Sequence, residues 1–194
     1  MSVVEEKARV RAEMRERLGA VSEERRAEQT AGIVGRLEGL KELGEVRWVG
    51  GFVPRRDEPD LWEWFLGWVR VKGGLALPRW NGETGGYEWC AVRDPGSDLV
   101  LGRYGIREPG PGCGVVDVRL LDFVVVPGIA FDRCGGRLGR GKGFYDRLLE
   151  SVAGVSCGVG LDEQLIPNVP VEPHDKRLNL VVVPGGLHGP GAPK

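Results

Sequence analysis

The chain contains the run Phe123-Val124-Val125-Val126-Pro127-Gly128, in which four apolar residues precede two residues that interrupt regular structure. An uninterrupted apolar run of this kind is typical of a central strand that is buried on both faces. Glycine then becomes frequent, because five glycines fall within residues 135–143, beside the basic side chains of Arg137, Arg140 and Lys142. A loop after a buried strand is the usual place for a ligand site in an open α/β sheet. The segment therefore predicts a central strand followed by a functional loop.

Strand and helix patterns alternate on both sides of this run. Helices are predicted at 4–18, 22–37, 61–68 and 144–152, strands at 46–53, 75–77, 123–126, 155–160 and 180–183, and weaker strands at 87–92 and 99–101. Such alternation predicts a layered α/β fold with a largely parallel central sheet flanked by helices. We expect one domain over residues 1–184 and a disordered tail over residues 185–194.

The composition excludes several classes of protein. The chain has 194 residues, enough for one hydrophobic core, and 27 basic against 28 acidic residues leave a net charge of -1. Such a balance gives no overall attraction for nucleic acid or for an anionic membrane. The charged start and the lack of a long apolar run argue against a signal peptide and a membrane span, so we expect a cytoplasmic protein. Four widely spaced cysteines indicate reduced thiols without a zinc or redox motif.

The stretch from Gly136 to Gly143 nearly fits a phosphate-binding loop, but Gly143 stands where a Ser or Thr would bind magnesium. Glycines still allow backbone N–H groups to approach an anion, and Arg and Lys add charge-assisted hydrogen bonds to phosphate oxygens. A helix that begins after Gly143 would direct its positive end to the same place. The alternative interpretation is a solvated basic turn.

Two carboxylates are candidate magnesium ligands. Asp146 lies in the first turn of the predicted helix, where an acid can also simply complement the helix dipole. Asp175 lies in a proline-bounded stretch and is alternatively a turn residue. Magnesium prefers one or two carboxylates together with phosphate oxygens, so the two together are compatible with a metal–phosphate site.

Taken together, these segments resemble the 5-formyltetrahydrofolate cyclo-ligases, also called methenyltetrahydrofolate synthetases. The resemblance is carried by residues 126–132, 137–146 and 173–175, and extends to Lys7, Arg11, 58–60, 106–109 and Gln164. Two departures stand out: Phe144 replaces a tyrosine common in the family, and Val183-Pro184 replaces a frequent Thr-Glu pair. Neither change removes a phosphate donor or a metal carboxylate.

The resemblance implies an ATP- and Mg²⁺-dependent closure of 5-formyltetrahydrofolate to 5,10-methenyltetrahydrofolate, with release of ADP and phosphate. In the family mechanism the γ-phosphoryl group moves to the formyl oxygen, N10 then attacks the formyl carbon, and phosphate departs. This route needs no protein nucleophile, which suits a sequence whose motif is an electrostatic cradle. The implied fold also resembles sugar-phosphate isomerases and CoA transferases.

The resemblance further implies roles for individual residues. The implied nucleotide contacts are Lys7, Arg11, Arg137, Leu138, Gly139, Arg140, Gly141, Lys142, Gly143, Phe144 and Tyr145. The implied folate contacts are Glu58, Tyr104, Arg140, Gly141, Lys142, Gly143 and Phe144. Asp146 and Asp175 would hold magnesium, and Arg140 and Lys142 would act catalytically where donor and acceptor meet. Glu58 would accept hydrogen bonds from the pterin and Tyr104 would stack, although alone they resemble a solvated loop acid and a half-buried aromatic residue.

Two other functions are compatible with parts of the pattern. A sugar-phosphate isomerase-like enzyme would use the glycine loop without ATP turnover, but it has no need of two magnesium carboxylates. A non-enzymatic nucleic-acid-binding module could use Arg137, Arg140 and Lys142, but the near-zero net charge and the lack of a basic tail disfavour it. We therefore expect a small-molecule substrate, 5-formyltetrahydrofolate, with no nucleic-acid or membrane partner, and a monomeric protein.

Overall fold

The computed structural model describes residues 2–192 of the protein and, for Tyr104, the backbone alone. Seven strands in this part of the chain form one sheet in the order β11-β10-β9-β6-β1-β2-β3. The strands are β1 (Trp48–Gly50), β2 (Gly74–Asn81), β3 (Gly86–Val92), β6 (Phe123–Val126), β9 (Val155–Val159), β10 (Leu180–Val183) and β11 (Gly186–His188). The five inner strands run parallel, and the edge strands β3 and β11 run antiparallel to their neighbours. The predicted largely parallel sheet is confirmed.

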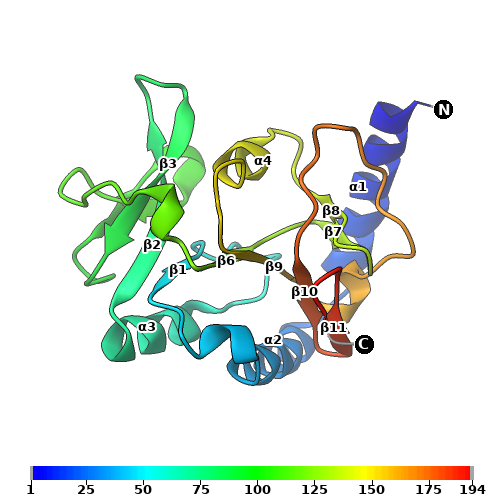
Figure 1. The fold of residues 1–194 in the computed structure, drawn as a ribbon. Coiled ribbons are helices and arrows are strands. Elements are labelled where there is room, and N and C mark those ends of the chain that lie inside the picture. Colours follow the sequence, from blue (N-terminus) through cyan, green and yellow to red (C-terminus); the bar gives the residue numbers. More distant parts are fainter. Residues whose placement is uncertain (1, 193–194) are drawn as a thin grey trace.

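Helices cover both faces of this sheet (Figure 1). They are α1 (Val3–Gly19), α2 (Glu23–Glu38), α3 (Trp62–Val71) and α4 (Phe144–Leu148), with single 3-10 turns η1 (Lys41–Leu43), η2 (Arg103–Gly105), η3 (Val118–Leu120) and η4 (Asp162–Gln164). Side chains of α1, α2 and α3 share one hydrophobic cluster with the sheet, whereas α4 joins a second cluster. Two short antiparallel pairs complete the fold, β4 (Leu99–Leu101) with β5 (Arg107–Pro109), and β7 (Ala130–Phe131) with β8 (Arg137–Leu138).

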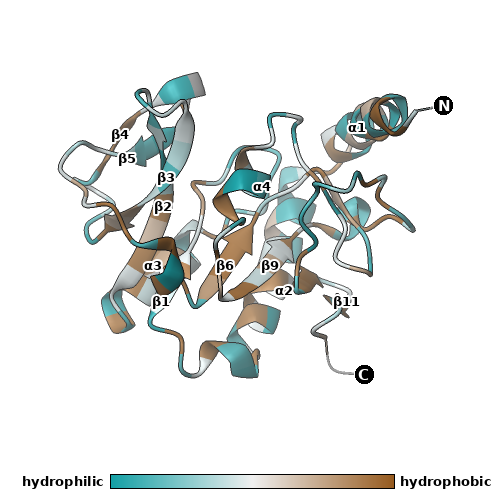
Figure 2. Cartoon of the chain, turned by 45° about the horizontal axis from the view of Figure 1, so that its top comes forward, coloured by the Kyte–Doolittle hydropathy of each residue, from teal (hydrophilic) through white to brown (hydrophobic). Residues whose placement is uncertain are grey.

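Strand β6 lies at the centre of the sheet and is buried along its whole length. Phe123 and Val125 belong to the cluster that α1, α2 and α3 cover, and Val124 and Val126 belong to the cluster on the α4 face. Successive side chains of a strand point to opposite faces, so an apolar run without alternation requires cover on both. Figure 2 shows this strand as a hydrophobic segment between the layers. The sequence prediction for residues 123–126 is confirmed.

Helix α1 begins with a capping box, in which the Ser2 hydroxyl accepts from the backbone N–H of Glu5 and the Glu5 carboxylate accepts from that of Ser2. Its buried side chains are Lys7, Val10, Met14 and Leu18, which follow the spacing of one helix face. The apolar part of the stripe packs in the core. Lys7 continues the same stripe toward the N-terminus, and its ammonium group reaches the cavity described below.

Strand β2 continues through Pro78, although the sequence pattern predicts that the strand stops before it. Pro78 pairs with Trp89 of β3 on one side, and β1 pairs with β2 only from Gly74 to Ala76. The missing N–H of Pro78 therefore faces an edge without a ladder partner, where proline is tolerated. The predicted strand at 46–53 is shorter than expected, since only Trp48–Gly50 pair in the sheet.

The glycine cluster is not one continuous loop. Its first part forms the β7–β8 hairpin, in which Ala130 pairs with Leu138 and Phe131 with Arg137, and its second part, Gly139–Gly143, leads to α4. The positive φ angles of Gly135, Gly141 and Gly143 (81°, 91° and 62°) explain why glycine occupies these turns.

Helix α4 has five residues, so the prediction of a helix to Val152 is wrong. The helix ends early because β9 already begins at Val155, and the chain returns to the sheet through Gly154, where a Cβ would lie 2.2 Å from the carbonyl oxygen of Leu121. A single turn of helix has little dipole, so the side chains of the loop carry the positive charge there.

The predicted disordered tail is also wrong for residues 186–188, which form β11 against β10. The antiparallel pairing satisfies the open edge of β10, a source of stability that a glycine-rich composition does not reveal. Residues 193 and 194 lie outside the described part of the chain. No helix among residues 2–192 has the length and apolar character needed to cross a membrane.

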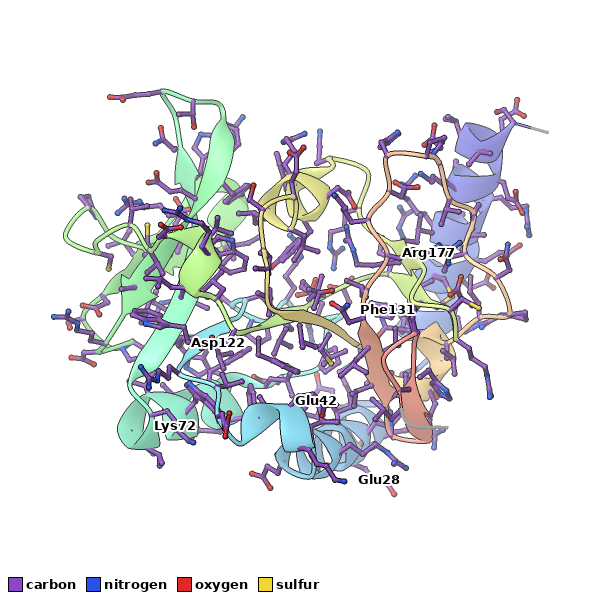
Figure 3. All side chains as sticks on the ribbon, viewed as in Figure 1. Glu28, Glu42, Lys72, Asp122, Phe131 and Arg177 are labelled. Carbon is purple, nitrogen blue, oxygen red and sulfur yellow. The ribbon has the colours of Figure 1, made fainter. Side chains whose placement is uncertain are left out.

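Asp122 and Phe131, labelled in Figure 3, each hold neighbouring segments of the fold together. The Asp122 carboxylate accepts from the backbone N–H groups of Arg47 and Trp48 at 2.8 and 2.9 Å, which joins the start of β6 to the start of β1. Phe131 is fully buried, and a Cβ at Gly128 or Gly158 would lie 2.6 Å from its ring. Glycine at these positions therefore allows the β7–β8 hairpin to pack closely on the sheet.

Candidate active site

A cavity of about 590 Å³ opens where β1 and β6 end, beside the middle of β2 and the loop that follows β8. This is the edge at which parallel α/β sheets usually bind ligands. The predicted site residues that line it are Lys7, Arg11, Glu58, Arg137, Leu138, Gly139, Arg140, Gly141, Lys142, Gly143, Phe144, Tyr145, Asp146 and Asp175. The fold thus brings together residues from both ends of the chain.

Tyr104 is the one predicted site residue that is not among the residues described as lining the cavity. Its backbone lies in η2, and its side chain is outside the part of the molecule that the structure describes. The predicted stacking role of Tyr104 stays a prediction.

A buried carboxylate organises the start of the glycine-rich segment. Asp132 Oδ1 accepts from the backbone N–H groups of Cys134 and Gly136 at 2.8 Å, and Oδ2 accepts from that of Val169 at 3.0 Å. Asp132 is only 3% exposed. Its carboxylate therefore fixes the β7–β8 turn to the segment that leads to Asp175.

Arg137 and Asp146 form a charged pair on the cavity wall. The Arg137 Nη2 atom lies 2.8 Å from Asp146 Oδ1, and the arginine side chain is 4% exposed. The Arg137 Nε atom is buried and has no hydrogen-bond partner within residues 2–192. A buried donor without a partner is costly, so Arg137 is suited to bind a ligand oxygen.

Lys7 joins α1 to the C-terminal segment of the site. Its Nζ atom lies 2.7 Å from Glu172 Oε2 and 2.5 Å from Asp175 Oδ2. Burial acts to lower the pKa of Lys7, but the hydrogen bonds to Asp175 and Glu172 outweigh it and raise the pKa above its ordinary value. The same contact lowers the pKa of Asp175 despite its partial burial. Both groups are therefore charged at neutral pH.

The donor set around Asp175 suits a divalent cation. Glu172, His174 and Asp175 each offer a ligand atom, and these atoms lie within 4.8 Å of one another. Asp146 lines the same cavity but pairs with Arg137. Carboxylate oxygens are the protein ligands that magnesium prefers, so the residues fit this ion.

Arg140 is held by two acids of the loop that follows β1. Its Nη2 atom lies 2.7 Å from Asp57 Oδ1 and 3.1 Å from Glu58 Oε1. Glu58 is 6% exposed, and burial raises the pKa of its carboxyl, which the Arg55 backbone N–H and the Arg140 charge offset only in part. Burial also acts to raise the pKa of Asp57, but its contacts with Arg140 outweigh this and lower it. Glu58 is thus a desolvated acceptor at the cavity wall.

Part of the cavity wall is apolar and aromatic. The rings of Tyr87 and Phe144 make an edge-to-face contact at 4.8 Å, and Trp80 packs on both rings. Leu77, Pro78 and Ile106 line the same cavity. This wall is shaped for a flat, largely apolar ligand group.

Sequence reasoning assigned no role to several residues that line the cavity, among them Glu172, His174, Tyr87 and Arg107. Glu172 and His174 flank Pro173 beside Asp175, so their proximity to a candidate metal ligand was a usable signal. Tyr87 and Arg107 come from β3 and β5 and reach the cavity only through tertiary packing.

These features define a class of protein. A mostly parallel sheet carries, at the carboxyl ends of its strands, a basic glycine-rich loop, a pair of carboxylates and an apolar wall. This arrangement is that of an α/β enzyme which binds a phosphate-bearing ligand beside an organic one.

The chain belongs to the 5-formyltetrahydrofolate cyclo-ligase family, whose sequence model matches residues 3–184. It is 32% identical to a 5-formyltetrahydrofolate cyclo-ligase of Mycolicibacterium smegmatis, over 92% of this chain and 93% of that protein. It is 27% identical to the cyclo-ligase of Mus musculus, over 89% of this chain and 91% of that protein. The solved structure of Aquifex aeolicus 5,10-methenyltetrahydrofolate synthetase superposes with a TM-score of 0.85 at 31% identity, covering 97% of this chain and 94% of that one.

Proposed function

We propose that the protein converts 5-formyltetrahydrofolate and ATP to 5,10-methenyltetrahydrofolate, ADP and phosphate, with magnesium as the metal. One observation carries the proposal: a single cavity has both a charged wall of cationic and acidic side chains and an apolar, aromatic wall. The first suits a metal–triphosphate group and the second suits the rings of a folate. Membership of the cyclo-ligase family supports the same reaction.

The nucleotide would bind along the charged wall. Lys7, Arg11 and Arg137 approach the cavity from α1 and β8, and the loop Gly139–Gly143 supplies backbone N–H groups between them. Arg11 Nε donates to the carbonyl oxygen of Gly139 at 2.9 Å, which holds the loop against α1. Guanidinium groups bind phosphate oxygens with charge-assisted hydrogen bonds.

The metal would bind at Asp175 and Asp146, with Glu172 beside them. Lys7 and Arg137 now neutralise these carboxylates, and both cations belong to the proposed phosphate-binding set. We infer that binding exchanges partners, so that the cations turn to phosphate while the carboxylates hold magnesium. The ion supplies charge that neutralises the phosphate oxygens.

The folate would bind between Glu58 and the apolar wall. The amino and ring N–H groups of a pterin are donors, and the desolvated Glu58 carboxylate is an acceptor without competing water. Tyr87, Ile106 and Phe144 offer the surface for the remaining aromatic ring. This arrangement directs the formyl group toward the glycine loop.

Chemistry would take place between Arg140 and Lys142. The formyl oxygen attacks the γ-phosphorus and ADP leaves; N10 then adds to the activated carbon, which closes the ring, N10 loses its proton, and departure of phosphate gives the methenyl product. Both side chains line the cavity, and they would stabilise the negative charge of the transferring phosphoryl group. Neither has to form a covalent bond to the substrate.

A direct assay tests this function. Purified protein is incubated with 5-formyltetrahydrofolate, and the absorbance of the methenyl product is followed with and without ATP and magnesium. We expect product only when both are present. Product formation without nucleotide would contradict the proposal.

Neutral variants test the metal assignment. Asp146→Asn and Asp175→Asn keep the side-chain shape but lose the charge, so each should raise the magnesium concentration needed for half-maximal ATP use by about tenfold or more. Asp117→Asn is the matched control, since Asp117 pairs with Arg119 and does not line the cavity. Unchanged magnesium dependence in both site variants would show that these residues do not hold the metal.

The proposal extends to the setting of the protein. We propose a monomeric cytoplasmic enzyme without a nucleic-acid partner. The net charge of -1 supports the last part, because phosphate-backbone binding relies on an excess of cationic side chains.

A further inference from the structure

Arg140 joins two segments that are far apart in the sequence. It lies in the loop Gly139–Gly143, and its partner Asp57 lies in the segment between β1 and α3, 83 residues away. Arg140 Nη2 lies 2.7 Å from Asp57 Oδ1 and 2.8 Å from Asp57 Oδ2. Both carboxylate oxygens of Asp57 therefore hold one nitrogen of the guanidinium group.

The contacts of Arg140 use only one end of its planar group. Nη2 also donates to Glu58 Oε1 at 3.1 Å, whereas Nε and Nη1 form no hydrogen bond with any residue of the described chain. The side chain lines the active-site cavity. Because a guanidinium group is planar and rigid, fixing Nη2 also fixes the direction of the other N–H groups. The donors on Nε and Nη1 thus remain for a ligand.

The two acids that contact Arg140 differ in burial and in charge. Glu58 lines the active-site cavity, and burial raises the pKa of its carboxyl. Burial also acts to raise the pKa of Asp57, but the contacts with Arg140 outweigh it and lower that pKa. Asp57 does not line the cavity. It is therefore a charged partner for Arg140 that lies outside the space a ligand would fill.

We propose that Asp57 is the positioning residue for Arg140. This inference rests on the proposed function, because it assigns Asp57 to the arginine that would stabilise the transferring phosphoryl group. Asp57 holds Nη2, so that Nε and Nη1 donate to the phosphoryl oxygens, and it leaves the Glu58 carboxylate to accept from the pterin. Asp57 acts through Arg140 and contacts neither substrate.

Asp57→Asn tests this role by steady-state kinetics. The amide keeps the shape but loses the charge and one acceptor, so Arg140 is free to turn toward Glu58. We expect kcat to fall by about tenfold to a hundredfold while the KM for ATP changes by less than about threefold. Asp117→Asn is the matched control, because it removes the acid of another Asp–Arg pair and Asp117 does not line the cavity. An unchanged kcat in Asp57→Asn would overturn the proposal.

A double-mutant cycle distinguishes a positioning role from a general structural one. The kcat values of Asp57→Asn, Arg140→Gln and the double variant are compared with that of the natural protein. If Asp57 acts through Arg140, adding Asp57→Asn to Arg140→Gln should lower kcat by less than about twofold further. Losses that multiply would mean that Asp57 acts elsewhere in the fold, and an unchanged kcat in Arg140→Gln would mean that there is no catalytic arginine to position. Either result would overturn the proposal.

Nitrogen NMR of the arginine side chains separates this inference from the proposed function, because it needs no turnover. A guanidinium group held at one nitrogen rotates slowly about its Cζ–N bond, so its two Nη atoms give separate signals. We expect separate signals for Arg140 in the natural protein, identified by their loss in Arg140→Gln, and one merged signal in Asp57→Asn. A merged signal in the natural protein would overturn the inference. Failure of the proposed function would instead appear as the absence of methenyl product with the separate signals intact.

Discussion

Individual arginines at the active site differ in what their guanidinium groups contact. Arg11 donates to a backbone carbonyl of the glycine loop, Arg137 pairs with a candidate metal ligand, and Arg140 pairs with two acids beside the proposed pterin site. Lys142 lies between two glycines of the same loop and is exposed. Because a lysine ammonium group sits on a flexible stem, we expect Lys142 to be the cation best able to follow a phosphoryl group as it moves.

Lys142→Met tests this role at the residue scale. Methionine keeps much of the length and removes the charge, so nucleotide binding through the other donors should persist while the transition state loses a donor. Loss of one such donor typically costs about a hundredfold to a thousandfold in rate. We expect kcat to fall by about that factor with a modest change in the KM for ATP, measured by steady-state kinetics at saturating folate. A raised KM at unchanged kcat would instead assign Lys142 to phosphate binding alone.

At the scale of elements, the site depends on how the β7–β8 hairpin is held. The hairpin packs on the sheet through Phe131, and its turn is tied by Asp132 to the segment before Asp175. The loop Gly139–Gly143 begins directly after β8, so the position of the hairpin sets the position of the proposed phosphate-binding groups. Asp132 thereby positions both the proposed nucleotide loop and the proposed metal segment without contacting either ligand.

Asp132→Asn tests this coupling. The amide can still accept from Cys134 and Gly136, but its NH₂ group would face the N–H of Val169 in place of an acceptor. We expect a loss of about 1.5–3 kcal/mol in the free energy of unfolding and a higher KM for ATP, measured by urea denaturation and steady-state kinetics. Asp94→Asn is the control, because Asp94 accepts from Gly96 N–H in an exposed turn. An unchanged KM for ATP in a destabilised Asp132→Asn protein would limit Asp132 to a folding role.

At the scale of the whole molecule, contacts between the two ends of the chain hold the parts of the candidate site together. Lys7 of α1 reaches Glu172 and Asp175, which are 165 and 168 residues away. The raised pKa of Lys7 and the lowered pKa of Asp175 mean that folding stabilises both charged forms. The contribution of this pair should therefore be constant through neutral pH.

Lys7→Met tests the contribution of the pair to stability. Removal of the cation leaves two partly buried carboxylates without their partner, so the free energy of unfolding should fall by about 1.5–3 kcal/mol at pH 7. Because the pKa of Asp175 is lowered, the difference between the two proteins should be present above its ordinary value of 3.8 and vanish as the pH falls below it. Urea denaturation at several pH values checks this. A difference that does not change down to pH 2 would mean that packing of the Lys7 stem, and not its charge, accounts for the loss.

Patterns within short segments were enough to predict most of the elements. The apolar run 123–126, the stripe of α1 and the turn residues around the glycine loop each reflect a local rule of burial or backbone conformation. The same rules failed where long-range packing intervened. Pro78 lies within β2 because no strand pairs beyond it on one side, and residues 186–188 form β11 because β10 offers an open edge.

The sequence by itself determined the class of fold, the glycine-rich and basic character of the loop before α4 and the identities of the candidate charged residues, because these depend on neighbours along the chain. Only the tertiary structure decided which of those residues meet. The pairs Lys7 with Asp175, Arg11 with the Gly139 carbonyl and Arg140 with Glu58 join positions 168, 128 and 82 residues apart. A second cavity likewise exists only where α1, α2 and the segment after β1 come together. Such contacts follow from how helices and strands pack, and the spacing of residues within one element carries no record of that packing.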